Sequence, residues 1–246
     1  MFTKLLLSIL FSSVLFAGDI NIAVAANVSY AIDDLKKEFN KEYPNINVKV
    51  TLGGSGKLTA QIMRGAPYQL FMSANMSYPE SLYKQSLTST KPTVYAQGAL
   101  SYLSRTKLDF SNPIKLLTDS KIKKIAIANP KTAPYGKASV EALKNLQIYE
   151  KIKTKFVYSE SISQTVSYTL LATDMGIIAK SSLYSSKMKR FKKGINWVEV
   201  DSTLYTPINQ GIVMLKNHND DALAFYNFIL SDKAKKIFQN FGYIVP

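Results

Sequence analysis

The chain has 246 residues, no cysteine, a single histidine and a formal net charge of +14. Without cysteine it can form neither disulfides nor thiolate metal sites, so a large hydrophobic core must stabilise the fold. The basic residues are spread along the chain, and we interpret their one tight cluster, between Lys187 and Lys193, as a solvated loop rather than a binding patch. Because the aromatic residues form no RNA-binding motif, we expect no nucleic-acid partner.

The N-terminus has the layout of a secretory signal peptide. Lys4 precedes an apolar run from Leu5 to Phe16, and the small residues Ala17 and Gly18 follow. The run is shorter than the roughly 20 residues that a membrane-spanning helix needs. A buried or anchoring helix is the alternative interpretation. We predict that residues 1–17 are a signal peptide and that the mature protein acts outside the cytoplasm.

Strands and helices alternate along the next part of the chain. The predicted strands are 20–25, 46–52 and 70–73, and the predicted helices are 57–63, 79–84 and a segment through Ile32, Leu35 and Phe39. The helical segments carry apolar residues on one face, as in Ile32, Leu35 and Phe39. This alternation predicts a parallel sheet with helices on both faces.

A second block of the same kind follows, and the chain then returns to the first. Its predicted strands are 124–128 and 175–179 and its predicted helices are 136–146 and 161–172; a strand at 210–215 and helices at 220–230 and 232–241 complete the chain. No linker or repeat separates the blocks. We predict an α/β fold with two lobes, each a mostly parallel sheet flanked by helices, one formed by residues 19–97 plus 205–246 and the other by 98–204.

Four strand-to-helix turns rich in small and hydroxyl residues are the most informative feature. They lie at residues 25–27, 53–56, 133–136 and 159–162. The first N–H groups of a helix have no intrahelical acceptor and sit at the positive end of its dipole, so such turns bind anions without charged side chains. Ligands of parallel sheets bind beyond the carboxyl ends of the strands. The four turns together therefore predict one anion site.

Each turn also has a plainer interpretation. Asn27 and Ser161 can cap helices, Tyr135 can be a packing residue, and the glycine-rich segment can be an ordinary turn. That segment is no phosphate-binding P-loop, because Thr51 and Leu58 stand where the motif needs Gly and Ser or Thr. The anion site is favoured because four such turns coincide in one chain.

Catalysis has little support in the sequence. His218 stands in a polar loop, which favours an exposed side chain over a general base. The acidic pairs Asp33-Asp34 and Asp220-Asp221 come at helix starts, where they complement the helix dipole rather than ligate a metal. We expect no enzyme, no cofactor and no metal bound directly by side chains.

Several motifs carry a resemblance to a known family. They are Ala25-Ala26-Asn27, Gly54-Ser55-Gly56-Lys57-Leu58, Gly65-Ala66-Pro67 followed by Leu70 to Ala74, Asn129-Pro130 and Ala133-Pro134-Tyr135-Gly136. In this order they resemble the periplasmic molybdate-binding proteins of ABC importers. The resemblance implies a two-lobed type II periplasmic binding protein, in the periplasm and monomeric, that captures molybdate or tungstate and hands it to a membrane permease.

The resemblance also implies the ligand set. The oxyanion-binding residues would be Ala26, Asn27, Ser55, Tyr135 and Ile162, with Tyr135 and Ile162 acting through backbone N–H groups. The Tyr135 hydroxyl would then be a bystander. One branch of the family has Ser in place of Asn27 and a Tyr as a fifth donor, where this chain has Ala179. The N–H groups of Ala26 or Asn27 are the candidates to replace it.

Donors alone would accept a dianion but reject hydrogen phosphate, whose proton would meet another donor, and the smaller sulfate would leave donors unpaired. Two other functions stay open. One is a binding protein for another cargo, either a different oxyanion or iron, although iron would need clustered Tyr, His and carboxylate ligands. The other is a secreted hydrolase.

Overall fold

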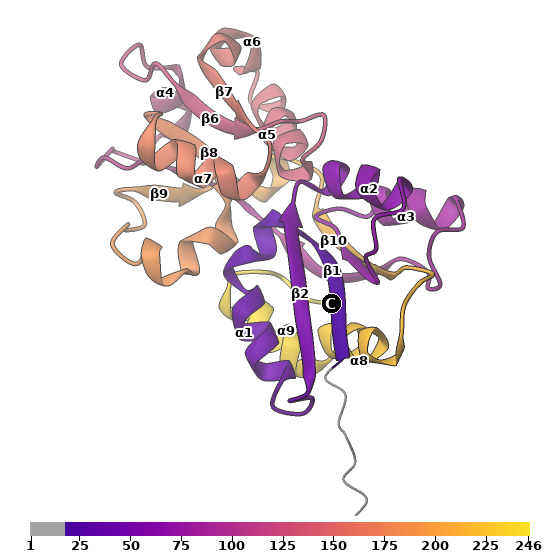
Figure 1. Ribbon diagram of the computed structural model, residues 1–246. Coiled ribbons are helices and arrows are strands. Elements are labelled where there is room, and N and C mark those ends of the chain that lie inside the picture. Colours follow the sequence, from indigo (N-terminus) through magenta and orange to yellow (C-terminus); the bar gives the residue numbers. More distant parts are fainter. Residues whose placement is uncertain (1–17) are drawn as a thin grey trace, which may run out of the picture.

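The computed structural model describes residues 18–246, which fold into two lobes (Figure 1). The predicted signal peptide, 1–17, lies outside the described residues. Each lobe is built on one five-stranded sheet. Between residues 18 and 246, no helix is both long and apolar enough to cross a membrane.

The strands in the sheet of the first lobe have the order β2-β1-β3-β10-β4. The strands are β1 Gly18–Ala25, β2 Ile46–Gly53, β3 Leu70–Met72, β4 Thr93–Gly98 and β10 Ile208–Met214, and the helices are η1 Ala26–Tyr30, α1 Ile32–Phe39, α2 Ser55–Met63, α3 Ser77–Lys84, α8 Asp220–Ile229 and α9 Asp232–Asn240. Alternate residues of β1 enter different cores: Ile22 and Val24 pack in the cluster that includes residues of α1, α8 and α9, and Ala23 packs with residues of α2. Helices therefore cover both faces of this sheet.

The second lobe contains the strand order β7-β6-β8-β5-β9. The strands are β5 Leu100–Leu103, β6 Ile125–Ala128, β7 Phe156–Ser159, β8 Met175–Ala179 and β9 Trp197–Glu199. The helices are α4 Pro113–Thr118, α5 Pro134–Asn145, α6 Tyr149–Ile152 and α7 Ile162–Leu171, with short 3₁₀ turns η2 Lys153–Lys155, η3 Lys180–Tyr184, η4 Ser186–Met188 and η5 Ser202–Leu204.

The predicted two-lobed α/β architecture is confirmed, with one refinement. Both sheets are mixed, because β10 runs antiparallel to β3 and β4 in the first lobe and β5 runs antiparallel to β8 and β9 in the second. The parallel pairs are β1 with β2 and β3, and β6 with β7 and β8. The antiparallel strands belong to segments where the chain crosses between the lobes.

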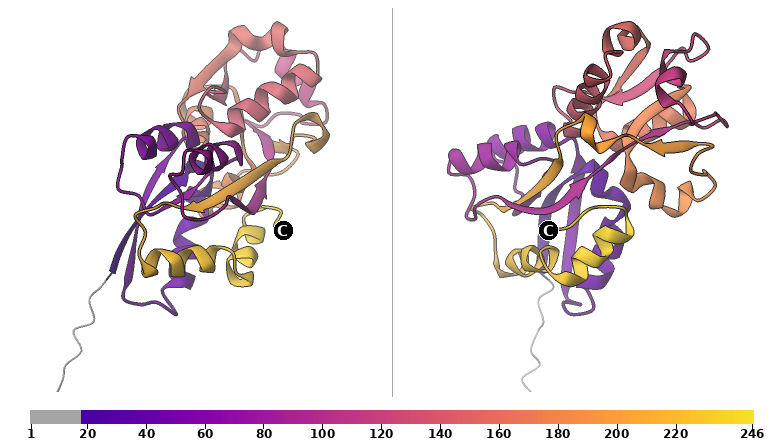
Figure 2. Two further views of the ribbon diagram at one scale, coloured as in Figure 1. Left: turned by 90° about the vertical axis from the view of Figure 1, so that its right-hand side faces the viewer. Right: turned by 180° about the vertical axis from the view of Figure 1, so that it is seen from behind.

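The lobes are connected at two places, between β4 and β5 and between β9 and β10. Figure 2 shows these crossing segments from the side and from behind. The division of the chain into 19–97 plus 205–246 and 98–204 stays a prediction. The crossings place the starts of α2, α5 and α7 in the region between the lobes.

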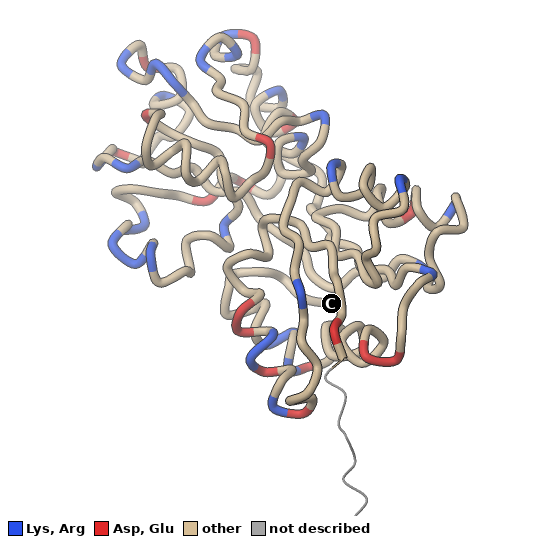
Figure 3. The backbone as a smooth tube through the Cα atoms, in the orientation of Figure 1, with Lys and Arg blue, Asp and Glu red and all other residues tan. Residues whose placement is uncertain are grey.

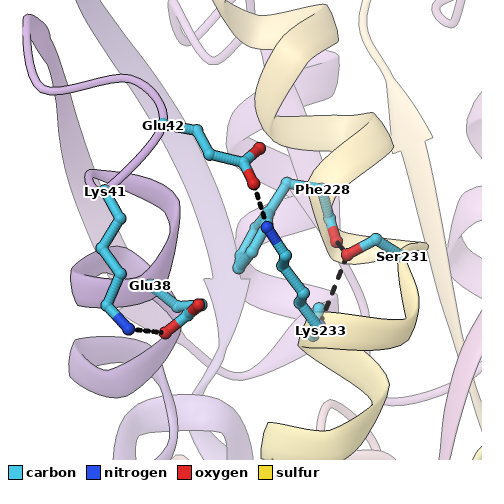
Figure 4. A network of polar contacts seen from close by, with 7 residues as sticks. Glu38, Lys41, Glu42, Phe228, Ser231 and Lys233 are labelled. Atoms are coloured by element: carbon cyan, nitrogen blue, oxygen red, sulfur yellow. Dashed lines mark hydrogen bonds and ion pairs between the residues drawn. The ribbon is translucent and has the colours of Figure 1, made fainter.

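Lys, Arg, Asp and Glu residues are spread over the helices and loops of both lobes (Figure 3). The basic residues of the segment from Lys187 to Lys193 are exposed, whereas Met188 and Phe191 between them are buried. On the first lobe an exposed network ties the end of α1 to α9 (Figure 4). There Lys41 pairs with Glu38 at 2.6 Å and Lys233 pairs with Glu42.

Candidate anion-binding site

A small cavity lies between the lobes. It is lined by Ala25, Ala26, Asn27, Gly53, Gly54, Ser55, Ala74, Ala133, Pro134, Tyr135 and Ile162. It leaves about 10 Å³ for the centre of a water-sized sphere, close to the smallest space that holds one buried water. None of the lining residues is charged, so the cavity suits one small guest held by neutral groups.

Four helices begin at this cavity. Their first residues are Ala26 of η1, Ser55 of α2, Pro134 of α5 and Ile162 of α7. The N–H groups at these starts have no intrahelical acceptor, and the positive ends of the helix dipoles converge there. A negative guest would therefore be favoured without any cationic side chain.

The local sequence explains why these helices start where they do. Pro134 is the first residue of α5, where its fixed φ suits the helix and its missing N–H costs nothing. Ser161 precedes α7, and its Oγ accepts from the N–H of Gln164 at 3.3 Å. The plainer interpretation of Ser161 as a cap is therefore confirmed. Asn27, by contrast, caps no helix, because the residue preceding η1 is Ala25.

Glycines let the lobes meet at the mouth of the cavity. A Cβ on Gly54 would lie 2.8 Å from the carbonyl oxygen of Glu160 in the other lobe. The N–H of Gly56 donates to the carbonyl of Thr132 across the same gap, at 3.0 Å. An exposed ion pair between Lys57 and Glu160, at 3.3 Å, also joins the two lobes. The lobes are thus closed, and the closing contacts are mainly backbone.

Ser55 offers a hydroxyl donor to the cavity. The side chain is 1% exposed, and its Oγ accepts from the N–H of Ala74 at 3.0 Å. A serine hydroxyl accepts through its lone pairs and donates one O–H. With the acceptor side engaged, the O–H is free to donate to a guest.

Asn27 is fully buried and largely bonded to the protein. Its Nδ2 donates to Gln210 Oε1 at 2.8 Å and to the Tyr243 hydroxyl at 2.9 Å. Its backbone carbonyl accepts from the hydroxyls of Tyr243 and Ser181. Its Oδ1, in contrast, has no hydrogen-bond partner among residues 18–246. An unpaired buried acceptor of this kind costs about 1–3 kcal/mol.

Gln210 of β10 connects Asn27 to two tyrosines. Its Oε1 accepts from the Tyr95 hydroxyl at 2.7 Å, and its Nε2 donates to the Tyr135 hydroxyl at 3.1 Å. Burial raises the pKa of Tyr95 and of Tyr135 well above the usual range, and it raises the pKa of Tyr243 to about 12. These phenols therefore stay neutral at physiological pH.

All five predicted oxyanion-binding residues line this one cavity: Ala26, Asn27, Ser55, Tyr135 and Ile162. Their roles as ligands stay a prediction. The Tyr135 hydroxyl accepts a hydrogen bond from Gln210 of the other lobe, and its expected lack of a direct role in anion binding stays a prediction. Ala179 ends β8 and is not among the lining residues.

Sequence reasoning missed Gln210, Tyr243 and Ala74 as parts of the site. Gln210 could have been recognised from the sequence, because it is a polar residue at the start of the otherwise apolar predicted strand 210–215. A buried polar side chain in such a strand needs hydrogen-bond partners. Neither Tyr243, far away in the sequence, nor the backbone N–H of Ala74 had a comparable signal.

The residues weighed for catalysis lie away from the cavity. His218 Nδ1 is 2.8 Å from the carbonyl oxygen of Leu215, in the loop after β10. The two acidic pairs lie in the first turns of α1 and α8. In the described part of the chain, no cluster of three or more His, Asp or Glu side chains could hold a metal ion.

Comparisons with known proteins identify the family. Residues 20–244 match the family model described as bacterial extracellular solute-binding protein. The chain is 32% identical over 231 residues to the molybdate-binding protein ModA of Azotobacter vinelandii, covering 92% of this chain and 90% of that protein. It is also 32% identical over 236 residues to ModA of Rhodobacter capsulatus, covering 93% and 89% of the two chains.

Solved structures of similar fold support this family assignment. The periplasmic molybdate-binding protein of A. vinelandii superposes with a TM-score of 0.85 at 30% identity, covering 92% of this chain and 99% of that one. The sulfate-binding protein SubI of Mycobacterium tuberculosis, at 14% identity and a TM-score of 0.73 over 92% of this chain and 86% of that one, shares the fold. The chain is a solute-binding protein and not an enzyme, and it belongs to the ModA family of bacterial extracellular solute-binding proteins.

Proposed function

We propose that this protein captures molybdate or tungstate in the cavity between its lobes and delivers the anion to the membrane permease of an ABC transporter. The observation that carries the proposal is the uncharged cavity at which four helices begin. Support also comes from two relatives at 32% identity that are named molybdate-binding proteins.

The proposed ligands are hydrogen-bond donors. The N–H groups of Ala26, Asn27, Tyr135 and Ile162 and the N–H and O–H groups of Ser55 would surround the oxygens of the anion. The metal would reach the protein only as part of an oxyanion, so no side chain would coordinate it directly. Because donors at helix starts are fixed in direction by the backbone, they favour one guest geometry.

Selectivity would follow from the donor set. A fully deprotonated tetrahedral dianion can accept from every donor, whereas the proton of hydrogen phosphate would meet a donor, at a cost of about 1–3 kcal/mol. Sulfate carries the same charge but is smaller, so some donors would stay unpaired. Size and protonation would thus select the cargo, rather than charge alone.

The cellular setting is part of the proposal. We place the mature protein in the periplasm, released by cleavage of a signal peptide at residues 1–17, and acting as a monomer without a cofactor. The closed lobes would present a joint surface to the permease only when the anion is bound. This coupling is the usual consequence of a ligand that binds better to one of two conformations.

A thermal-shift panel tests the proposal. Molybdate, tungstate, sulfate, phosphate, chromate and ferric citrate are added separately at equal concentration to the mature chain. A ligand that binds only the folded state adds about 4 kcal/mol of stability at a thousandfold excess over Kd. We expect a large rise in melting temperature with molybdate or tungstate and little with sulfate or phosphate. An equal response to sulfate would contradict the proposed selectivity. A response to ferric citrate alone would show that the cargo is iron rather than an oxyanion.

A further inference from the structure

The unpaired Oδ1 of Asn27 conflicts with a cavity that holds an oxyanion. Asn27 lines the cavity, its Nδ2 donates to Gln210 and Tyr243, and its Oδ1 is buried without a hydrogen-bond partner among the described residues. An acceptor facing an anion is repulsive. The nitrogen end of the same amide would be attractive, because it donates.

Gln210 decides which end of the Asn27 amide is free. Its side chain is fully buried, and its Oε1 holds Asn27 Nδ2 at 2.8 Å. As long as the Gln210 oxygen faces Asn27, the Asn27 amide must donate to it through Nδ2. If Gln210 Nε2 faced Asn27 instead, Asn27 would accept through Oδ1, and its Nδ2 would be free to donate elsewhere.

The surrounding groups accommodate both arrangements. The oxygen and nitrogen ends of an amide have nearly the same size, so turning both amides by half a rotation preserves the contacts. The Tyr135 hydroxyl, which now accepts from Nε2, would donate to the Gln210 oxygen, and the Tyr95 hydroxyl would donate to the Ser73 carbonyl, which is 3.5 Å away. The Tyr243 hydroxyl, which now accepts from Asn27 Nδ2 and donates to the Asn27 carbonyl, would donate to Asn27 Oδ1 instead, and that carbonyl would keep its hydrogen bond from Ser181.

We propose that Gln210 is a positioning residue for the bound oxyanion, acting through the Asn27 amide. This inference rests on the proposed function. In the observed arrangement of the two amides, Asn27 Oδ1 is unpaired. An oxyanion stabilises the reversed arrangement, because Asn27 Nδ2 then donates to it. The anion thereby selects between two states of one buried network.

A double-mutant cycle tests this role, with affinity for molybdate measured by calorimetry. Gln210→Met keeps the length of the side chain but removes both polar ends, and we expect it to weaken binding by about tenfold. In the Asn27→Ala background the same change should weaken binding less than about twofold, because the group through which Gln210 acts is gone. A merely structural role would give the same fold-loss in both backgrounds, which would overturn the inference.

Two further measurements complete the test. Asn196→Leu removes another buried amide, one that bonds to Lys192 and to carbonyls of the second lobe, and should leave affinity unchanged. In the ¹⁵N-labelled parent, molybdate should shift the side-chain amide signals of both Asn27 and Gln210, a readout that holds even if Gln210→Met fails to fold. A Gln210 signal that stays in place while molybdate binds would overturn the inference alone. A parent that binds neither molybdate nor tungstate would overturn the proposed function and this inference with it.

Discussion

Two polar networks in this molecule follow opposite principles. The network around the cavity is buried and uncharged, and it joins Asn27, Gln210 and three tyrosines from both lobes. The network at the end of α1 is exposed and charged, and it joins Glu38, Lys41, Glu42 and Lys233 within one lobe (Figure 4). The hydrogen bonds of the first network are directional. The ion pairs of the second network are exposed and need no defined geometry.

The difference explains how a chain of net charge +14 can bind an anion selectively. Exposed lysines attract every anion, and salt screens that attraction within about 10 Å. The cavity contains no charged residue, so a guest must satisfy the directions of its donors. Substitutions in either network, and in the glycines where the lobes meet, test this difference.

Ser55→Ala removes the hydroxyl donor from the cavity. We expect molybdate binding to weaken by about 1.5–3 kcal/mol, the worth of a hydrogen bond to a charged group. Because the Oγ also accepts from the Ala74 N–H, we expect the stability to fall by about 1 kcal/mol. Calorimetry and urea unfolding measure the two effects.

Ser139→Ala is the matched control. This serine is equally buried, but its hydroxyl donates to the Tyr135 carbonyl and does not line the cavity. It should retain the affinity of the parent. If Ser55→Ala also binds like the parent, the glycine-rich turn is only a turn.

Gly54→Ala hinders the closure of the two lobes but removes no hydrogen-bond donor from the cavity. Its Cβ would lie 2.8 Å from the Glu160 carbonyl oxygen of the other lobe. Overpacking of this kind costs about 1–3 kcal/mol, and here the cost falls on the closed, ligand-bound form. The melting temperature without ligand should hardly change, because Gly54 has an ordinary φ of −65°. Calorimetry should show the loss of affinity.

Gly53→Ala provides the comparison for Gly54. Its Cβ would meet only the Leu58 side chain of the same lobe, at 3.2 Å or more. A flexible side chain can move away, so the loss of affinity should be smaller. Equal losses in the two variants would show that contact between the lobes is not the cause.

Tyr135→Phe breaks the buried network at the phenol. Without the hydroxyl, Gln210 Nε2 loses the acceptor of its hydrogen bond, and we expect the stability to fall by about 0.5–1.5 kcal/mol. The backbone N–H of Tyr135 remains, so the direct contribution of this turn to binding should persist. Tyr102→Phe, at a buried tyrosine of β5 outside the network, should change neither quantity. A loss of affinity as large as that of Ser55→Ala would show that the phenol contributes to binding, either directly or through Gln210.

Lys233→Ala breaks the exposed network and should have the smallest effect. Exposed ion pairs contribute about 0–1 kcal/mol, because water and salt screen them. Affinity for molybdate should not change. Urea unfolding at low and high salt checks the first expectation and calorimetry the second. A loss of affinity would show that surface charge contributes to capture.

Sequence periodicity predicted the buried strands and amphipathic helices well. The segment 175–179 is a strand with the predicted bounds, and helix 136–146 begins only two residues earlier, at Pro134. Strands β4, β5, β7 and β9 were missed. β7 and β9 are short and only partly buried, so they lack a clear alternation. β4 mixes buried and partly buried residues without alternating, and all four residues of β5 are buried.

The helix starts of the site could be predicted from the sequence, but the buried hydrogen bonds that support them could not. Small and hydroxyl residues before helices marked the turns at Asn27, Ser55, Tyr135 and Ile162, because that chemistry is local to the chain. The bonds from Gln210 to Asn27 and Tyr135 span 183 and 75 residues. Only the folded topology brings such partners together.

A crystal structure with molybdate, phased on the anomalous signal of molybdenum, tests the central claim most directly. The account predicts one molybdenum peak in the cavity, with oxygens contacted by the N–H groups of the four helix starts, by Ser55 Oγ and by Asn27 Nδ2, and with no lysine or arginine within hydrogen-bond distance. A peak against the exposed lysines between Lys187 and Lys193, or an anion held by Lys57, would contradict it.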